Sequence, residues 1–287
     1  MSVKEYEAQF TDVVNRLSRA SIEDYYNPYA TFDWPERIET DGLWMSRDLM
    51  TVAGTEAEQE LTQEQLLALS KWESIHFYSL NVHGIRELLI EVMHRIHTPH
   101  YEIPTQFFHH FIGEENEHMW FFAEFCLRYG GKIYPDRKIV FEDEESPLVA
   151  SFLVFSRILI FERIVDYFNA RMGSDKALHP TIQAINRIHH QDESRHIAFG
   201  CQLVKILFLR LLDEGSPAEI ERAKAYVPRY IEASVRGLYE PRVYRDAGIE
   251  EPLAFRERLL ADPGRRQATD KVVASTVAFY KRIGVMA

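Results

Sequence analysis

The sequence predicts an all-α protein built around a bundle of four long helices, and three observations carry this prediction. Apolar residues recur with helical periodicity over long stretches of the 287 residues. Alternation of Val, Ile and Thr over strand-length segments does not stand out. Capping boxes, prolines at first helical positions and glycines after helix ends divide the chain. We expect one domain over 1–287, with core helices at about 60–213, an outer segment over 1–59 and further helices over 214–287.

The first half of the chain is predicted to hold the outer segment and the first helix pair. A helix is expected near 4–19, and the aromatic, proline-containing stretch 25–44 is expected to wrap over the outside of the bundle. A Thr-x-x-Gln capping box begins a core helix over 62–96. Its partner is expected over 104–130, because proline is tolerated in a first helical turn and a Gly-Gly pair ends the segment.

The second half is predicted to supply the other helix pair. A polar connection over 135–145 leads to a helix over 147–173, which is apolar on nearly all sides and therefore belongs in the middle of a bundle. The fourth core helix is expected over 180–212. A second capping box at 216–219 begins a helix that carries Pro228 as a potential kink, and the remainder is expected to form one or two shorter helices.

Composition argues against several classes of partner. The net charge of −11 argues against binding to nucleic acid or to an anionic membrane surface, which requires a basic patch. The longest apolar stretch, 149–161, contains Arg157 and is too short to span a bilayer. The N-terminus lacks a signal-peptide core, and Cys126 and Cys201 suit a reducing compartment. We expect a cytoplasmic protein. We also expect it to form a homodimer, as soluble helical enzymes commonly do.

Two copies of one motif predict a metal centre. Glu115 precedes His118 by three residues, and Glu193 precedes His196 by three, so each pair shares one face of its helix. One such pair is common by chance, but two pairs on two long helices form half of a carboxylate-bridged dimetal site. Glutamate oxygens with imidazole nitrogens suit iron or manganese, whereas structural zinc and iron–sulfur clusters prefer thiolates.

Such a site also requires one glutamate from each of the other two core helices. Glu162 interrupts an apolar run, where an unpaired carboxylate is costly to bury. A fold of the chain near Gly173 brings Glu162 to the height of Glu193, which favours a role as a metal ligand. The alternative is a salt bridge from Glu162 to Arg157 or Arg163.

The first core helix offers several candidates for the remaining glutamate. Glu87 is the preferred ligand, because the midpoint between it and Glu115 falls inside the predicted turn. For Glu73 and Glu91, the midpoint with Glu115 fits the predicted turn less well. His83 lies one turn before Glu87 on the same face, and is either an alternative ligand or a hydrogen-bond partner of a ligand.

A third histidine and two acids extend the motif on the fourth core helix and its partner. His189 stands four residues before Glu193, so these two residues and His196 form a stripe on one helix face. We expect His189 to bind metal; a hydrogen-bonded core histidine is the alternative. Glu114 and Asp192 each precede a motif glutamate and fit a role in orienting the ligating imidazoles, with exposed helix acids as the alternative.

This pattern resembles the ferritin-like di-iron N-oxygenase family whose best-known member is p-aminobenzoate N-oxygenase. The likeness covers roughly residues 60–240, and its most diagnostic part is the added His189 in the stripe with Glu162 upstream. The resemblance implies a ferritin-like four-helix bundle that holds two iron ions. The iron ligands that it implies are Glu115, His118, Glu162, His189, Glu193 and His196.

The resemblance also implies a function. Similar proteins use O2 and a di-iron centre to oxidise an amine toward hydroxylamine, nitroso or nitro products, often in natural-product biosynthesis. We expect an O2-dependent oxygenase that acts on the nitrogen of a small amine or amino-acid-derived substrate. An external electron donor is required, because no flavin or nicotinamide fingerprint is present. The alternatives are a hydroxylase or desaturase acting on carbon, and a ferritin-type ferroxidase or metal-binding protein.

Overall fold

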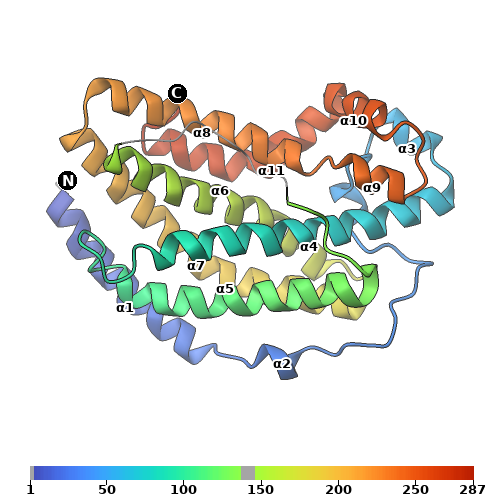
Figure 1. Cartoon of the computed structure of the whole chain (residues 1–287), viewed down its shortest axis with the longest axis horizontal. Coiled ribbons are helices and arrows are strands. Elements are labelled where there is room, and N and C mark those ends of the chain that lie inside the picture. The colour runs from blue at the N-terminus through green and yellow to red at the C-terminus, as the bar shows by residue number, and fades with distance from the viewer. Residues whose placement is uncertain (1–2, 137–145) are drawn as a thin grey trace.

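The protein is helical throughout the part of the chain that the structure describes (Figure 1). The computed structural model describes residues 3–136 and 146–287, so most of the predicted connection over 135–145 lies outside the described residues. Strands are absent from the described residues, and the predicted all-α class is confirmed. Within the same ranges, no helix combines the length and apolar character needed to cross a bilayer.

Four long helices form the core in two antiparallel pairs (Figure 1). Helix α4 (Gln63–Met93) pairs with α5 (Thr105–Phe125), and α6 (Pro147–Ser174) pairs with α7 (Pro180–Glu214). These bounds match the four predicted core helices to within a few residues. The bundle therefore places the middle of each motif-bearing helix, α5 and α7, in the interior.

Capping residues and a glycine fix where the first two core helices begin and end. The Thr62 hydroxyl accepts a hydrogen bond from the Gln65 backbone, and the Gln65 side chain accepts one from the Thr62 N–H, which completes the capping box of α4. A π-helical turn over Cys126–Gly130 follows α5, and Gly131 then ends the segment at a φ of 65°. That left-handed conformation suits glycine, which has no Cβ to clash.

The N-terminal segment covers one side of the bundle (Figure 1). Helix α1 (Val3–Glu23) packs against α7 and α5, and the short helix α2 (Pro28–Thr31) follows it. The chain then passes through a 3-10 turn, η1 (Arg47–Leu49), and α3 (Glu56–Glu60). Aromatic rings attach this segment to α5, where Trp120 lies 4.4 Å from the ring of Tyr29.

The C-terminal segment contains more helices than the sequence prediction allowed. Helix α8 (Pro217–Gly237) packs on α6 and remains one helix across Pro228. Three helices follow in place of the one or two predicted: α9 (Pro241–Asp246), α10 (Pro252–Ala261) and α11 (Pro263–Arg282). Each begins with a proline, which lacks an N–H group and has a φ suited to a first helical turn. These prolines divide the region after α8 into three helices.

Aromatic rings fill the interior of the bundle on both sides of the motif residues. The ring of Phe122 lies 4.8 Å from the ring of His189, and that of Phe111 lies 4.6 Å from His196. Tyr78 of α4 stacks on Phe122 with ring centroids 5.1 Å apart. The acids and imidazoles of the bundle therefore lie in an apolar, water-excluding surrounding, where unpaired charge is costly.

Candidate metal centre

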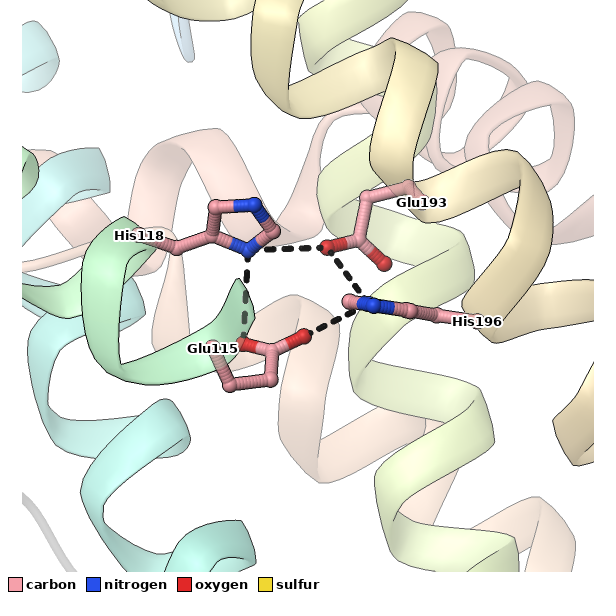
Figure 2. A group of neighbouring side chains, drawn as sticks. All are labelled: Glu115, His118, Glu193 and His196. Atoms are coloured by element: carbon pink, nitrogen blue, oxygen red, sulfur yellow. Dashed lines mark ion pairs between the residues drawn. The ribbon is translucent and has the colours of Figure 1, made fainter. Parts of the chain in front are cut away.

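Two glutamates and two histidines meet in the middle of the bundle (Figure 2). Glu115 and His118 come from α5, and Glu193 and His196 come from α7. One potential ligand atom from each lies within 4.8 Å of the others, and all four side chains are buried. Because α5 and α7 are antiparallel and the glutamate and histidine of each motif are three residues apart, the two pairs face each other across the helix interface.

The four side chains form a ring in which each carboxylate faces both imidazoles (Figure 2). Nδ1 of His196 lies 2.7 Å from Oε1 of Glu115 and 3.5 Å from Oε1 of Glu193. Nδ1 of His118 lies 3.6 Å from Oε2 of Glu115 and 3.7 Å from the same Glu193 oxygen. Both imidazoles thus direct the same nitrogen, Nδ1, toward the carboxylates.

Several of these atoms are close together without forming hydrogen bonds. Among the described residues, Nδ1 of His118, Nδ1 of His196 and Oε1 of Glu115 have no hydrogen-bond partner although they are fully buried. The same holds for Oε2 of Glu193. Donor atoms that converge on common points without pairing with one another fit the coordination of cations. The carboxylate and imidazole donors suit iron or manganese.

The opposite nitrogen of each imidazole is held by an acid outside the ring. Nε2 of His118 lies 3.0 Å from Oδ2 of Asp192, and Nε2 of His196 lies 2.7 Å from Oε2 of Glu114. A carboxylate can only accept, so each imidazole donates from Nε2, and Nδ1 is the nitrogen that faces the interior. Glu114 and Asp192 therefore occupy the orienting positions that the sequence analysis expected of them.

A cation and a phenol hold these two acids in place. Arg195 donates to Asp192 at 2.5 Å and to Glu114 at 3.0 Å. The hydroxyl of Tyr26, which follows α1, donates to Oδ2 of Asp192 at 3.1 Å. Tyr26 was not among the predicted site residues, since it lies far away in sequence and carries no motif. The N-terminal segment thus contributes to the centre as well as covering the bundle.

Glu162 of α6 lies buried next to the ring. Its side chain is 2% exposed, and its Oε1 atom has no hydrogen-bond partner in the described ranges. Burial and the negative charge of Glu193 raise the pKa of Glu162 well above its ordinary value. The predicted alternative, a salt bridge to Arg157 or Arg163, does not form: Arg157 faces Glu91 at 3.8 Å, and Arg163 donates to Cys201.

His189 extends the donor set along α7. Its Nε2 atom lies 2.9 Å from Oε1 of Glu193, and its ring centroid lies 4.4 Å from that of His118. Its Nδ1 atom contacts the side-chain amide of Asn169 on α6. As in the other two imidazoles, one nitrogen contacts a neighbour and the other faces the carboxylates, but here the neighbour is the amide nitrogen of Asn169, a donor, in place of a carboxylate. Asn169 was not predicted, although it stands seven residues after Glu162 and so shares its helix face.

The centre is strongly acidic in character, and protons on the imidazoles offset the carboxylate charge. Burial alone would lower the pKa of His118, but the carboxylates of Asp192 and Glu115 raise it to about 10. Burial would raise the pKa of Glu115, yet His118 and His196 lower it well below its ordinary value. Positive charge is therefore favoured between these groups, and metal binding would displace the protons.

The structure does not bring Glu87 or His83 into this cluster. The Glu87 side chain is 51% exposed and pairs with Arg86 at 3.0 Å. Nε2 of His83 lies 2.7 Å from the carbonyl oxygen of Tyr134. Tyr78 of α4 stacks on Phe122 of α5, and this contact shows which residues of the two antiparallel helices are level. By this measure Glu87 is nearly level with Glu115 along the bundle axis, as the predicted midpoint requires. It did not give the face of the helix, and Glu87 lies on an outer face of α4.

The two other candidates on α4 also lie outside the cluster. Glu73 is buried but accepts hydrogen bonds from the Thr51 backbone at 3.1 and 3.2 Å. Glu91 pairs with Arg95 at 2.7 Å. The structure therefore does not support the predicted α4 ligand, Glu87, and the less favoured Glu73 and Glu91 also lie away from the cluster.

Comparisons with known proteins agree with this geometry. Two uncharacterized proteins, one from Mycobacterium tuberculosis and one from Mycobacterium bovis, are each 24% identical to this chain over 221 residues. Each match covers 71% of this chain and 63% of the relative, so the chain spans less than two thirds of the length of these curated relatives.

Solved structures with the same fold include two variants of R2-like ligand-binding oxidase, one with an aerobically and one with an anaerobically reconstituted Mn/Fe cofactor. Their TM-scores are 0.51 and 0.52 at 16% and 15% identity, and the matches cover 97% of this chain and 94% and 93% of theirs. They support the ferritin-like fold. A profile of the p-aminobenzoate N-oxygenase AurF family matches residues 7–284. This chain therefore belongs to the p-aminobenzoate N-oxygenase AurF family.

Proposed function

We propose that this chain is an O2-dependent di-iron oxygenase that oxidises the nitrogen of a small amine or amino-acid-derived substrate. Membership of the family supports an oxidoreductase with a dinuclear metal centre. The observation that carries the proposal is the third imidazole, His189, whose Nε2 atom lies 2.9 Å from Oε1 of Glu193 within the buried donor set. A simple pair of Glu-x-x-His motifs does not require this residue.

Six buried side chains would hold the two ions, and they comprise three carboxylates and three imidazoles. These residues are Glu115, His118, Glu162, His189, Glu193 and His196. When bound, two iron ions would supply the redox chemistry that reduces O2. In the proposed overall reaction, R–NH2, O2, two electrons and two protons give R–NHOH and H2O. An external reductant must supply the two electrons.

The protein around the centre would orient the ligands and exclude water. Asp192 and Glu114 each accept from Nε2 of an imidazole and so fix which nitrogen faces the interior. Arg195 offsets the charge of both acids. Phe111 lies against the centre on one side and restricts access of bulk water. These contacts support a reaction in a dry, preorganised site.

A cavity of about 300 Å³ between α4, α6 and α8 is the proposed approach for the substrate. Its apolar wall on α6 includes Ile158, Phe161 and Val165, which are neighbours of Glu162 on that helix. Glu87 and Glu91 also line it, and each of them is paired with an arginine. The apolar wall would equally accept a hydrocarbon, so oxidation of carbon in the same centre is the second candidate function.

The test is to load the purified chain anaerobically with ferrous iron, count the metal, and admit O2 with and without a panel of aryl and alkyl amines. We expect two iron ions per chain, one amine-dependent O2 consumed per turnover, and a hydroxylamine product detected by mass spectrometry. Oxidation of only C–H substrates would replace the first candidate with the second. Accumulation of bulk ferric mineral, with no organic product, would contradict both candidates and support a ferroxidase.

The metal itself is tested in the same experiment. The donor set suits manganese as well as iron, and the similar oxidase structures hold Mn/Fe. Elemental analysis after loading with equal amounts of both metals separates the two compositions. Equal amounts of manganese and iron in the active form would contradict the di-iron assignment while leaving the dinuclear centre intact.

A further inference from the structure

The centre requires a donor on α4, and the structure offers a residue that is not a glutamate. The bundle scheme calls for a Glu-x-x-His pair on two core helices and one carboxylate on each of the other two. Glu162 fits this role on α6, whereas Glu73, Glu87 and Glu91 of α4 are engaged elsewhere. Asn81 of α4 is 0% exposed and is the residue that height and helix face select.

The position of Asn81 along the bundle axis follows from a contact one helical turn before it. The Asn186 amide of α7 donates to the hydroxyl of Tyr78 of α4 at 2.6 Å, so these two residues are level. Helices α4 and α7 run in the same direction, because both are antiparallel to α5. Three residues further along each helix stand Asn81 and His189. Asn81 is therefore level with an imidazole of the centre.

The face of Asn81 follows from its neighbours on α4. Tyr78 faces α5 and α7, as its contacts to Phe122 and Asn186 show. Gly84 faces α6, where an added Cβ would lie 2.4 Å from the Phe161 ring. At 100° per residue, Asn81 lies between these two faces and so on the side of α4 directed to the bundle interior.

The side chain of Asn81 has one hydrogen-bonding group engaged and one open. Its Nδ2 atom donates to the carbonyl oxygen of Phe77 at 2.8 Å. In the described part of the chain its Oδ1 atom has no partner, although it is buried. Leaving a buried carbonyl oxygen unpaired is unfavourable. An amide oxygen is a hard donor that iron and manganese accept, so a metal ion would satisfy it.

We propose that Asn81 is the α4 ligand of the dinuclear centre and supplies a neutral amide oxygen where the bundle scheme places a carboxylate. This inference rests on the proposed centre. The α6–α7 half then has Glu162, Glu193 and two imidazoles, whereas the α4–α5 half has a single carboxylate, Glu115, with His118 and Asn81. Less negative charge faces the ion in the α4–α5 half, and that ion binds more weakly. The two metals therefore load in two separate steps.

The experiment is an anaerobic titration of the full chain with Mn(II), followed by electron paramagnetic resonance and thermal unfolding. The wild-type chain binds one ion tightly and a second more weakly. Asn81→Asp keeps the size of the side chain and adds a negative charge, so the second ion binds at least about tenfold more tightly. Asn81→Leu keeps the first ion and loses the second, and the signal of coupled manganese ions disappears.

Asn186→Asp is the matched control. Asn186 is also fully buried on a core helix and also has an open Oδ1 atom within the described residues, but it lies one turn away from the centre. Both Asp variants bury a new carboxylate, whereas only Asn81→Asp is expected to increase the thermal stabilisation that Mn(II) gives. If Asn81→Leu fails to fold, the two Asp variants still decide the question.

Three results would overturn the inference in distinguishable ways. Unchanged affinities for both ions in Asn81→Asp and Asn81→Leu would show that Asn81 is not a ligand, while the dinuclear centre would stand. A similar gain in Asn186→Asp would show a general effect of buried charge. A wild-type chain that binds no metal at all would remove the centre itself, and the inference with it.

Discussion

The motif helices α5 and α7 differ from α4 in how completely their sequence determines the centre. On α5 and α7, a glutamate and a histidine three residues apart share one helix face, so the spacing specifies both height and direction. Their four side chains meet within 4.8 Å. On α4 a single residue must be chosen, and spacing along the chain gives only its height. A motif therefore predicts a site better than a lone residue of the right type.

The largest expected effect tests the motif helices. Glu193→Ala removes the carboxylate that faces His118, His189 and His196. We expect the iron content after anaerobic loading to fall from two ions per chain to fewer than one, with loss of oxygenase turnover. Elemental analysis measures the metal, and far-ultraviolet circular dichroism checks that the helices remain. Full iron content in this variant would contradict the role of the motif.

The next effect compares the two lone glutamates. Glu162→Gln removes a charge from a side chain that is 2% exposed at the centre, whereas Glu87→Gln changes a half-exposed side chain that pairs with Arg86. We expect Glu162→Gln to lose about one iron ion per chain and Glu87→Gln to keep both. Iron content measured side by side decides between them. The opposite pattern would restore Glu87 as the ligand and remove Glu162.

A smaller effect is expected where an acid only orients an imidazole. Asp192→Asn weakens the contact to Nε2 of His118 and should reduce metal affinity by about 10–100-fold. The comparison variant is Asp166→Asn, because Asp166 contacts Nδ1 of His190, which is not a proposed ligand, at 2.5 Å. Competition with a fluorescent chelator measures both. Equal losses in the two variants would indicate a general effect of removing a His–Asp contact.

The smallest effect on the centre concerns the buried Glu73 of α4. Burial raises its pKa to about 7, although hydrogen bonds from Thr51 act in the opposite direction. A raised pKa means that the folded state binds the proton more tightly than the unfolded state. The stabilisation is therefore complete below about pH 4.5 and is lost as pH rises toward 7, by at most about 3 kcal/mol.

Urea unfolding of the metal-free chain at several pH values tests this dependence. Glu73→Gln cannot ionise, so it should become more stable relative to the wild-type chain between pH 4.5 and 7 and level off above that range. Metal content should not change in this variant. A constant difference between the two chains across the pH range would show that Glu73 does not titrate with a raised pKa.

The parts of the fold that the sequence predicted are those set by local chemistry. Capping boxes and apolar periodicity predicted the four core helices, and the Glu-x-x-His spacing predicted which side chains of α5 and α7 meet. Individual side-chain contacts from the outer segment to the centre were not predicted. Tyr26 reaches Asp192 only because α1 packs along α7, and no local pattern marks it.

Two further differences have specific physical reasons. Asn81 carries neither a charge nor an imidazole, so its residue type does not mark it as a metal ligand although it lies on the inward face of α4. The C-terminal region was predicted to contain one or two helices after α8, whereas prolines begin three separate helices there, α9, α10 and α11. In both cases the missing information was the direction or the boundary of a helix and not its existence.

Anomalous X-ray diffraction from crystals of the iron-loaded chain, recorded at the iron edge, tests the central claim most directly. The proposed centre predicts two peaks between α5 and α7, one bonded to Nδ1 of His118 and the other to Nδ1 of His196. It also predicts that carboxylate oxygens of Glu115 and Glu193 lie within bonding distance of these peaks. A single peak, or peaks outside this ring of side chains, would contradict it.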